Sequence, residues 1–142
     1  MGVSEVRVKK RETGATATLG RNGHPQIATP TGGALAVVTA ASEPGFNPLD
    51  LLYSSLAACL VLSARIAASR MGVLDRFESV EARVTGEKSE GEPARITHFE
   101  MRLNITGNFD AQMKQAIAHQ AEEICTVSNT LRSDAAFNLS VE

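Results

Sequence analysis

The chain has 142 residues, a length typical of one domain, and its 14 Lys plus Arg against 16 Asp plus Glu give a formal charge of −2. Hydrophobic residues make up 43% and charged residues 21%, which excludes a disordered chain and indicates a single globular domain over residues 1–142. Because there is no basic excess and aromatic residues are limited to five Phe and one Tyr, we expect no nucleic-acid partner.

The distribution of apolar residues also bears on location. The longest uncharged apolar stretch, between Asp50 and Arg65, has 14 residues, whereas a membrane-spanning helix needs roughly 20. The first residues alternate and carry charge, so we expect neither a secretory signal nor a membrane partner. The prediction is a cytoplasmic protein in which Cys59 and Cys125 are reduced thiols or a redox pair.

The N-terminal third of the chain has short segments of strand type, separated by turn residues. Residues 3–10 alternate with period two and predict a half-exposed strand, and further strands are expected at 15–19, 26–28 and 34–39. Residues 20–23 (Gly-Arg-Asn-Gly) predict a tight hairpin turn with Arg21 at its tip. A loop rich in breakers, residues 42–48, follows.

The hydrophobic period changes after Asn47. This residue is a good N-cap, Pro48 suits the first helical position and Gly72 suits the position after the end, so we expect a helix over 48–71. One stripe of the predicted helix has Cys59 at its centre and contains Leu52, Ser55, Leu56, Cys59, Leu62, Ser63 and Ile66. Since the helix is apolar over much of its circumference, we expect its own sheet and a second subunit to enclose it.

The remaining elements complete a mixed fold. Residues 77–88 and 96–106 predict two long antiparallel strands, and Asp110 caps a second predicted helix that ends near Cys125. Alternation at 136–141 predicts a terminal strand. The order of elements indicates an α+β fold, with mostly antiparallel sheet and a long buried central helix.

Each cysteine, taken alone, is more often a small buried hydrophobic residue than a reactive group. The three histidines, His24, His98 and His119, have no spacing typical of a zinc site, so we expect no metal. A phosphate-binding glycine loop is not evident either, and composition alone leaves the function open.

Three segments, one around each cysteine and one around Arg21, favour a reactive function for the two thiols. Residues 47–59 (NPLDLLYSSLAAC) and 121–131 (AEEICTVSNTL) surround the two cysteines, and residues 15–23 (ATATLGRNG) surround Arg21. All three resemble, in the same order, the motifs of the OsmC/Ohr family of thiol-dependent peroxidases. The resemblance implies the OsmC-like fold, an intertwined homodimer with sites at the subunit interface, and no cofactor.

The resemblance also implies a role for each residue. Cys59 would attack an organic hydroperoxide as the thiolate and become a sulfenic acid, which Cys125 would convert to a disulfide. Arg21 would supply the cation that favours the thiolate, and an external dithiol such as a lipoyl group would reduce the disulfide. An aliphatic substrate pocket around Cys59 is expected to contain Leu52, Leu56, Leu62 and Ile66.

Two positions depart from the family pattern. Leu49 lies ten residues before Cys59, where the family pattern has a glutamate that pairs with the arginine. On a regular helix that position is about 80° from Cys59, whereas Asp50 is about 180° away. Asp50 is therefore a weak candidate partner for Arg21, and Glu43, in the loop before the helix, is another weak candidate. Thr126 stands where many members have proline.

Two alternative functions stay open. In one, the chain is a non-enzymatic OsmC-like protein whose pocket binds a lipid-like or thiol ligand, with cysteines that sense redox state or are inert. In the other, it is a structural subunit with two unreactive thiols. Turnover of a peroxide, and its loss on replacement of Cys59, distinguishes the enzyme from both.

Overall fold

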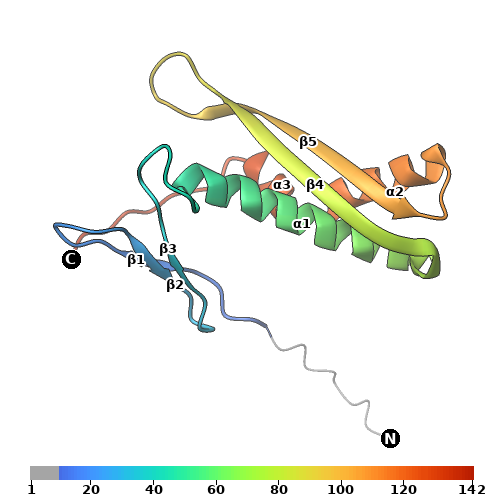
Figure 1. Ribbon diagram of the computed structural model, residues 1–142, viewed down its shortest axis with the longest axis horizontal. Coiled ribbons are helices and arrows are strands. Elements are labelled where there is room, and N and C mark those ends of the chain that lie inside the picture. The colour runs from blue at the N-terminus through green and yellow to red at the C-terminus, as the bar shows by residue number, and fades with distance from the viewer. Residues whose placement is uncertain (1–9) are drawn as a thin grey trace, which may run out of the picture. The chain divides into compact units, whose positions relative to one another are not determined.

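A computed structural model describes residues 10–142, which form two compact units divided between Leu49 and Asp50 (Figure 1). Each unit is described by itself. The strand predicted at residues 3–10 lies outside the described residues, apart from Lys10, which is not in a strand.

The N-terminal unit contains a three-stranded antiparallel sheet in the order β1 (Thr16–Thr18), β2 (Gln26–Ala28) and β3 (Ala34–Ala36). These strands confirm the predicted ones, although β1 and β3 are shorter. The predicted tight turn is wrong: β1 and β2 first pair at Thr18 and Gln26, so that residues 19–25 form an open loop. Pro25 lies in this loop and has no N–H to extend the ladder toward a shorter turn.

The second unit is built around α1 (Pro48–Arg70), which confirms the long predicted helix. The helix ends as its sequence indicates, because Gly72 takes a positive φ of 72° that favours glycine. The N–H groups of Met71 and Val73 then donate to the carbonyls of Ala67 and Ala68, at 2.9 Å in both cases.

After a 3-10 turn at Leu74–Arg76, strands β4 (Phe77–Lys88) and β5 (Ile96–Gly107) form a long antiparallel hairpin, as predicted. Its register places apolar side chains opposite one another on one face, in the pairs Val80 with Ile105, Ala82 with Leu103, and Val84 with Met101. Figure 1 shows the hairpin running alongside α1. This apolar face contributes to both core clusters of the unit.

Helix α2 (Ala111–Ile124) follows, and the Asp110 carboxylate accepts a hydrogen bond of 2.7 Å from the Met113 N–H, which confirms the predicted cap. A short helix that the sequence analysis missed, α3 (Thr126–Leu131), comes one residue later. The terminal strand predicted at 136–141 is wrong, because this segment has no regular structure. Phe137 and Leu139 are 93% and 94% exposed, so the alternating side chains pack against no core in the described chain that would favour a strand.

The buried face of α1 also differs from the predicted stripe. The buried residues are Leu56, Leu60, Ser63, Ala64, Ala67 and Ala68. Leu62 and Ile66 are instead 52% and 42% exposed. Because α1 is apolar on most sides, its periodicity did not define the inner face. Three of the six buried residues are alanines, and these pack in one cluster with Ile105 of β5 and Ile117 of α2.

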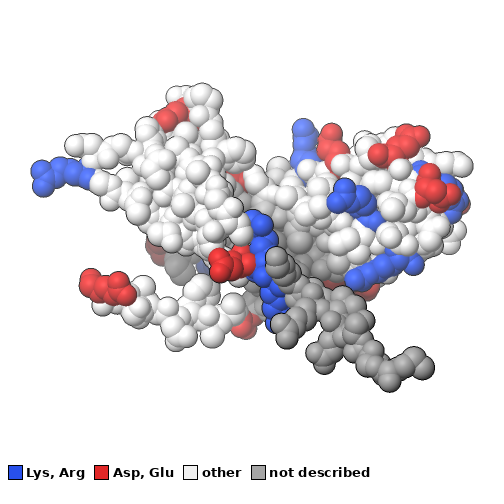
Figure 2. All heavy atoms as spheres, turned by 90° about the horizontal axis from the view of Figure 1, so that it is seen from below, with Lys and Arg blue, Asp and Glu red and all other residues white. Residues whose placement is uncertain are grey.

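The fold is therefore α+β, with antiparallel sheets and a long central helix. Among the described residues, only α1 is long enough and apolar enough to cross a membrane. The core helices of soluble proteins also meet these two criteria of length and composition. Its packing against β5 and α2 marks it as such a core helix. On the face shown in Figure 2, the Lys and Arg side chains of the described residues are mixed with Asp and Glu.

Candidate active site

Cys59 lies near the middle of α1, where no proline or glycine interrupts the helix. Its side chain is half-buried and packs against a small core cluster of Leu56, Leu60 and Cys125. The first two members of the cluster come from α1, within one turn of Cys59 on either side. The helix therefore holds one thiol in a fixed position while leaving it partly accessible.

Cys125 lies at the junction between α2 and α3 and is fully buried. Its backbone N–H closes α2 by donating to the Ala121 carbonyl at 3.0 Å. Its sulfur caps α3 by accepting a hydrogen bond from the Ser128 N–H at 3.4 Å. The second thiol is thus held by two helix ends, and both cysteines are free thiols.

The environment shifts the pKa values of the two thiols in opposite directions. Burial raises the pKa of Cys59, but hydrogen bonds outweigh this effect, so that the net pKa is below the usual value of a thiol. The donors are the Val127 N–H, the Cys125 thiol, the Ser63 hydroxyl and the Thr126 N–H. Burial raises the pKa of Cys125, and the neighbouring Cys59 sulfur adds to that rise. The pair therefore favours a thiolate at Cys59 beside a protonated Cys125.

Of the three charged residues of the predicted site, two precede α1 in the sequence and one lies in its first turn. Arg21 is exposed in the loop between β1 and β2. Glu43 is engaged within its own unit, where its Oε1 lies 2.8 Å from His24 Nε2. Asp50 lies in the first turn of α1. The activation of Cys59 by Arg21 stays a prediction.

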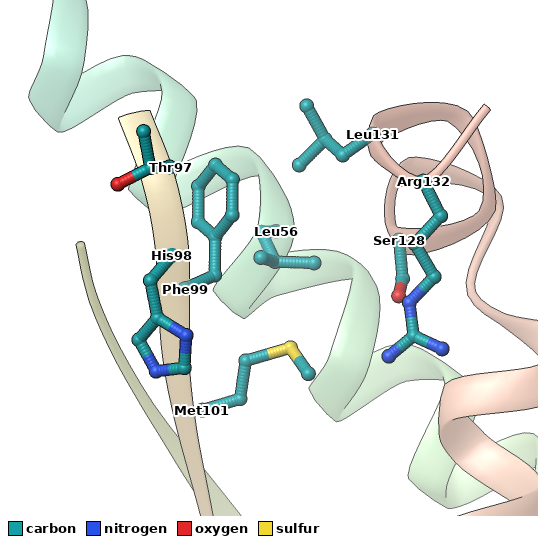
Figure 3. A pocket seen from close by; sticks show the side chains of 8 residues that line it. All are labelled: Leu56, Thr97, His98, Phe99, Met101, Ser128, Leu131 and Arg132. Atoms are coloured by element: carbon teal, nitrogen blue, oxygen red, sulfur yellow. The ribbon is translucent and has the colours of Figure 1, made fainter. Parts of the chain in front are cut away.

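A hollow of about 190 Å³ is lined by Leu56, which packs in the same cluster as Cys125, and by Ser128 (Figure 3). Its apolar lining comes from α1, β5 and α3 and consists of Leu56, Phe99, Met101 and Leu131; its polar lining consists of Thr97, His98, Ser128 and Arg132. Figure 3 shows Arg132 and His98 on opposite sides of this space. Ser128 connects the hollow with the thiols, because its N–H is the donor to Cys125.

The structure separates the four residues predicted to form one substrate pocket. Leu56 lines the hollow beside the thiols. Leu62 lines a different hollow, which contains Arg65 and Phe77. Ile66 lies on an exposed side of α1, and Leu52 is half-buried. In the described chain Leu56 and Leu62 thus line two different hollows, and the face that carries Leu62 and Ile66 is exposed.

Three polar residues of the site were missed. Ser63, which the sequence analysis placed only in the packing stripe, is 3% exposed and hydrogen-bonds Cys59. Its spacing of four residues from Cys59 on a helix was the available signal. Ser128 and Arg132 follow Cys125 on and just after α3, so they could not be placed without that helix.

This arrangement suits thiol redox chemistry. It combines a nucleophile with a lowered pKa, a second thiol in hydrogen-bonding contact, and a nearby hollow with an apolar and a polar side. Among residues 10–142, no group of His, Cys, Asp or Glu is arranged to hold a metal ion.

Comparisons with known proteins agree with this fold. The family model described as OsmC-like protein matches residues 40–140. No curated protein matches the sequence. Among solved structures, an OsmC-like protein from Mycoplasma pneumoniae is 19% identical with a TM-score of 0.73, and the alignment covers 88% of this chain and 89% of that one.

Two further structures carry a functional description. An organic hydroperoxide resistance protein from Elizabethkingia anophelis is 23% identical with a TM-score of 0.70, over 89% of this chain and 93% of that one. The organic hydroperoxide resistance protein OhrB of Bacillus subtilis is 23% identical with a TM-score of 0.65, over 85% and 90%. At these identities the similarity shows a shared fold.

Proposed function

The chain belongs to the OsmC-like protein family, and from this premise we propose that it is a thiol peroxidase that reduces organic hydroperoxides to alcohols. The observation that carries the proposal is the contact between Cys59, whose pKa is lowered, and Cys125, whose pKa is raised. Only a thiolate attacks a peroxide efficiently, and only a nearby thiol resolves the product. Two structures similar in fold are organic hydroperoxide resistance proteins, which supports the same substrate class.

The proposed reaction begins at Cys59. Its thiolate attacks the terminal oxygen of the hydroperoxide, so that a sulfur–oxygen bond forms as the oxygen–oxygen bond breaks. The leaving alkoxide takes a proton from water and departs as the alcohol, and Cys59 is left as a sulfenic acid. Sulfur is oxidised by two electrons and the peroxide is reduced by two.

The second step uses the buried thiol. The Cys125 sulfur attacks the Cys59 sulfenic acid, a disulfide forms, and the hydroxyl leaves with the Cys125 proton as water. An external dithiol, such as a lipoyl group, then donates two electrons and two protons to restore both thiols. A reducing cytoplasm is the compartment that supports such a cycle.

Arg21 has a defined place in this proposal. A guanidinium near the Cys59 sulfur favours the thiolate and orients the peroxide. The hydrogen bonds from Ser63, Thr126 and Val127 stabilise the thiolate independently of Arg21. We therefore expect modest activity even though Leu49 replaces the glutamate of the family pattern.

A homodimer is part of the same proposal. Exposed apolar side chains occur on α1, after it and in the C-terminal segment: Leu62, Ile66, Leu74, Phe137, Leu139 and Val141. Their burial in a second copy would remove a large apolar area from water.

That residues 1–142 form a single domain stays a prediction.

Peroxide consumption tests the function directly. With a dithiol reductant, we expect wild type to consume cumene hydroperoxide faster than hydrogen peroxide, Cys59→Ser to be inactive, and Cys125→Ser to form no intramolecular disulfide and to lose activity through over-oxidation of Cys59. Equal and slow consumption by wild type and Cys59→Ser would instead favour the non-enzymatic alternative.

A further inference from the structure

The hollow beside the thiols has an uneven distribution of charge. Its lining contains one permanently charged side chain, Arg132, and no Asp or Glu. Leu56, Phe99 and Leu131 provide an apolar wall. In Figure 3 these side chains and Arg132 surround the same space. An anion with an apolar body matches both features.

Arg132 retains the capacity to bind such an anion. Its Nη2 pairs with Glu122 Oε1, and the Arg132 side chain is still 63% exposed. A guanidinium has five N–H donors, so one ion pair leaves donors for a second carboxylate. Glu122 lies outside the lining of the hollow and therefore acts on a ligand only by competing for Arg132.

We propose that this hollow binds an aliphatic carboxylate, with the acid group on Arg132 and the chain against Leu56, Phe99 and Leu131. A volume of about 190 Å³ equals that of about six waters, which is enough for a short aliphatic segment and less than a drug-sized pocket. The ligand is therefore a slender chain whose remainder extends outside the hollow. An uncharged chain of the same length lacks the ion pair and binds more weakly.

Binding there is coupled to the thiols through two residues. Leu56 lies one turn before Cys59 and packs in the same cluster as Cys125. Ser128 lines the hollow and donates its N–H to the Cys125 sulfur at 3.4 Å. If the proposed peroxidase function holds, on which this step rests, Arg132 selects hydroperoxides that carry a carboxylate.

Calorimetric titration of the reduced full-length protein tests the binding itself, with octanoate, octanol and acetate as probes. We expect octanoate to bind about fivefold more tightly than octanol, and acetate to show no measurable binding. Arg132→Gln should weaken octanoate binding about fivefold and leave octanol unchanged. Glu122→Gln should strengthen octanoate binding, because it removes the competing carboxylate.

Arg102→Gln is the matched control, since Arg102 is exposed on β5 outside the hollow and its loss changes the net charge equally. An equal loss of octanoate binding in Arg102→Gln, equal binding of octanol and octanoate, or no octanoate binding would each overturn the inference. Thermal unfolding of each variant identifies any that fails to fold, and Arg132→Met, which keeps an apolar stem without the charge, then takes the place of Arg132→Gln.

Turnover separates this inference from the proposed function. If octanoate binds as described but no hydroperoxide is consumed, the peroxidase proposal fails and the carboxylate site stands. If cumene hydroperoxide is consumed but Arg132→Gln changes neither octanoate binding nor the KM for a carboxylated hydroperoxide, the carboxylate site fails and the peroxidase stands.

Discussion

Cys59 packs against the core cluster that contains Cys125, and a hydrogen bond from the Cys125 thiol helps to lower the pKa of Cys59 while the Cys59 sulfur raises the pKa of Cys125. The donor must keep its proton for the bond to exist, so Cys125 resists ionisation while Cys59 ionises more readily. The resulting pair has a nucleophile and a protonated partner that pack against the same core cluster. This is the arrangement that the two steps of the proposed cycle require.

The first prediction concerns pH. Because the pKa of Cys59 is lowered, the rate of its alkylation by iodoacetamide should reach half of its plateau at a lower pH than for an ordinary thiol. Cys125→Ala removes one hydrogen-bond donor and should move this midpoint to higher pH. Cys125→Ser keeps a donor and should move it less. A midpoint that does not change in Cys125→Ala would contradict the hydrogen bond.

A second prediction uses the departure at Thr126, whose backbone N–H is one of the donors that lower the pKa of Cys59. Thr126→Pro removes this N–H, so the Cys59 midpoint should rise and the alkylation rate below it should fall about twofold to fivefold. Thr126→Ala keeps the N–H and is the control.

The backbone accommodates this proline. Thr126 is the first residue of α3, where proline is favoured, and Cys125 before it is extended, with φ −64° and ψ 106°. Loss of the helix therefore does not explain a change in reactivity. Identical midpoints in Thr126→Pro and Thr126→Ala would show that this N–H does not act on Cys59.

The third prediction tests the close packing of α1. Ala67 is fully buried in the cluster that contains Ile105 of β5 and Ile117 of α2. Ala67→Leu should lower the free energy of unfolding in urea by about 1–3 kcal/mol, because the added methylenes overpack this contact. Ala58→Leu, on an exposed position of the same helix, should change it little. A stable Ala67→Leu protein would mean that the core has room to rearrange.

Local signals in the sequence were enough for the long elements. Pro48 and Gly72 bracket α1, and Asp110 caps α2, because helix ends depend on neighbouring residues. Packing with β5 and α2 determines which face of α1 is buried. The sequence pattern could not predict that face, because the helix is apolar on most sides. Helix α3 was missed because its cap is a cysteine sulfur, which is not among the residues that normally mark a helix start.

The candidate site shows the same division. Cys59 and Cys125 could be selected from their surrounding motifs, but Ser63, Ser128 and Arg132 contribute only once α1, β5 and α3 are assembled. The predicted grouping of Leu62 and Ile66 with Leu56 assumed that one stripe faces one pocket. In the structure Leu56 is buried and lines the hollow, whereas Leu62 and Ile66 are exposed.

The fourth prediction concerns the homodimer and the exposed C-terminal segment. Light scattering should give about twice the mass of one chain, since an interface of standard size forms by covering such apolar surface. Replacement of Phe137, Leu139 and Val141 by serine should shift the protein toward monomer, because these side chains are at least 90% exposed in a single chain. Serine at Asn138 and Ala136 is the control. An unchanged dimer would place the interface elsewhere.

The last prediction addresses Arg21 and Leu49. If Arg21 supplies the cation for Cys59, Arg21→Ala should reduce the rate with cumene hydroperoxide at least tenfold, about the effect of losing one charge-assisted hydrogen bond. The pH midpoint of Cys59 alkylation should also rise. Leu49→Glu should partly improve the rate, because a carboxylate ten residues before Cys59 can orient the guanidinium. Arg83→Ala, at an exposed position of β4, controls for the loss of one positive charge. If Arg21→Ala changes neither the rate nor the midpoint, Arg21 is a loop residue only, and the hydrogen bonds from Ser63, Val127 and Cys125 are sufficient to activate Cys59.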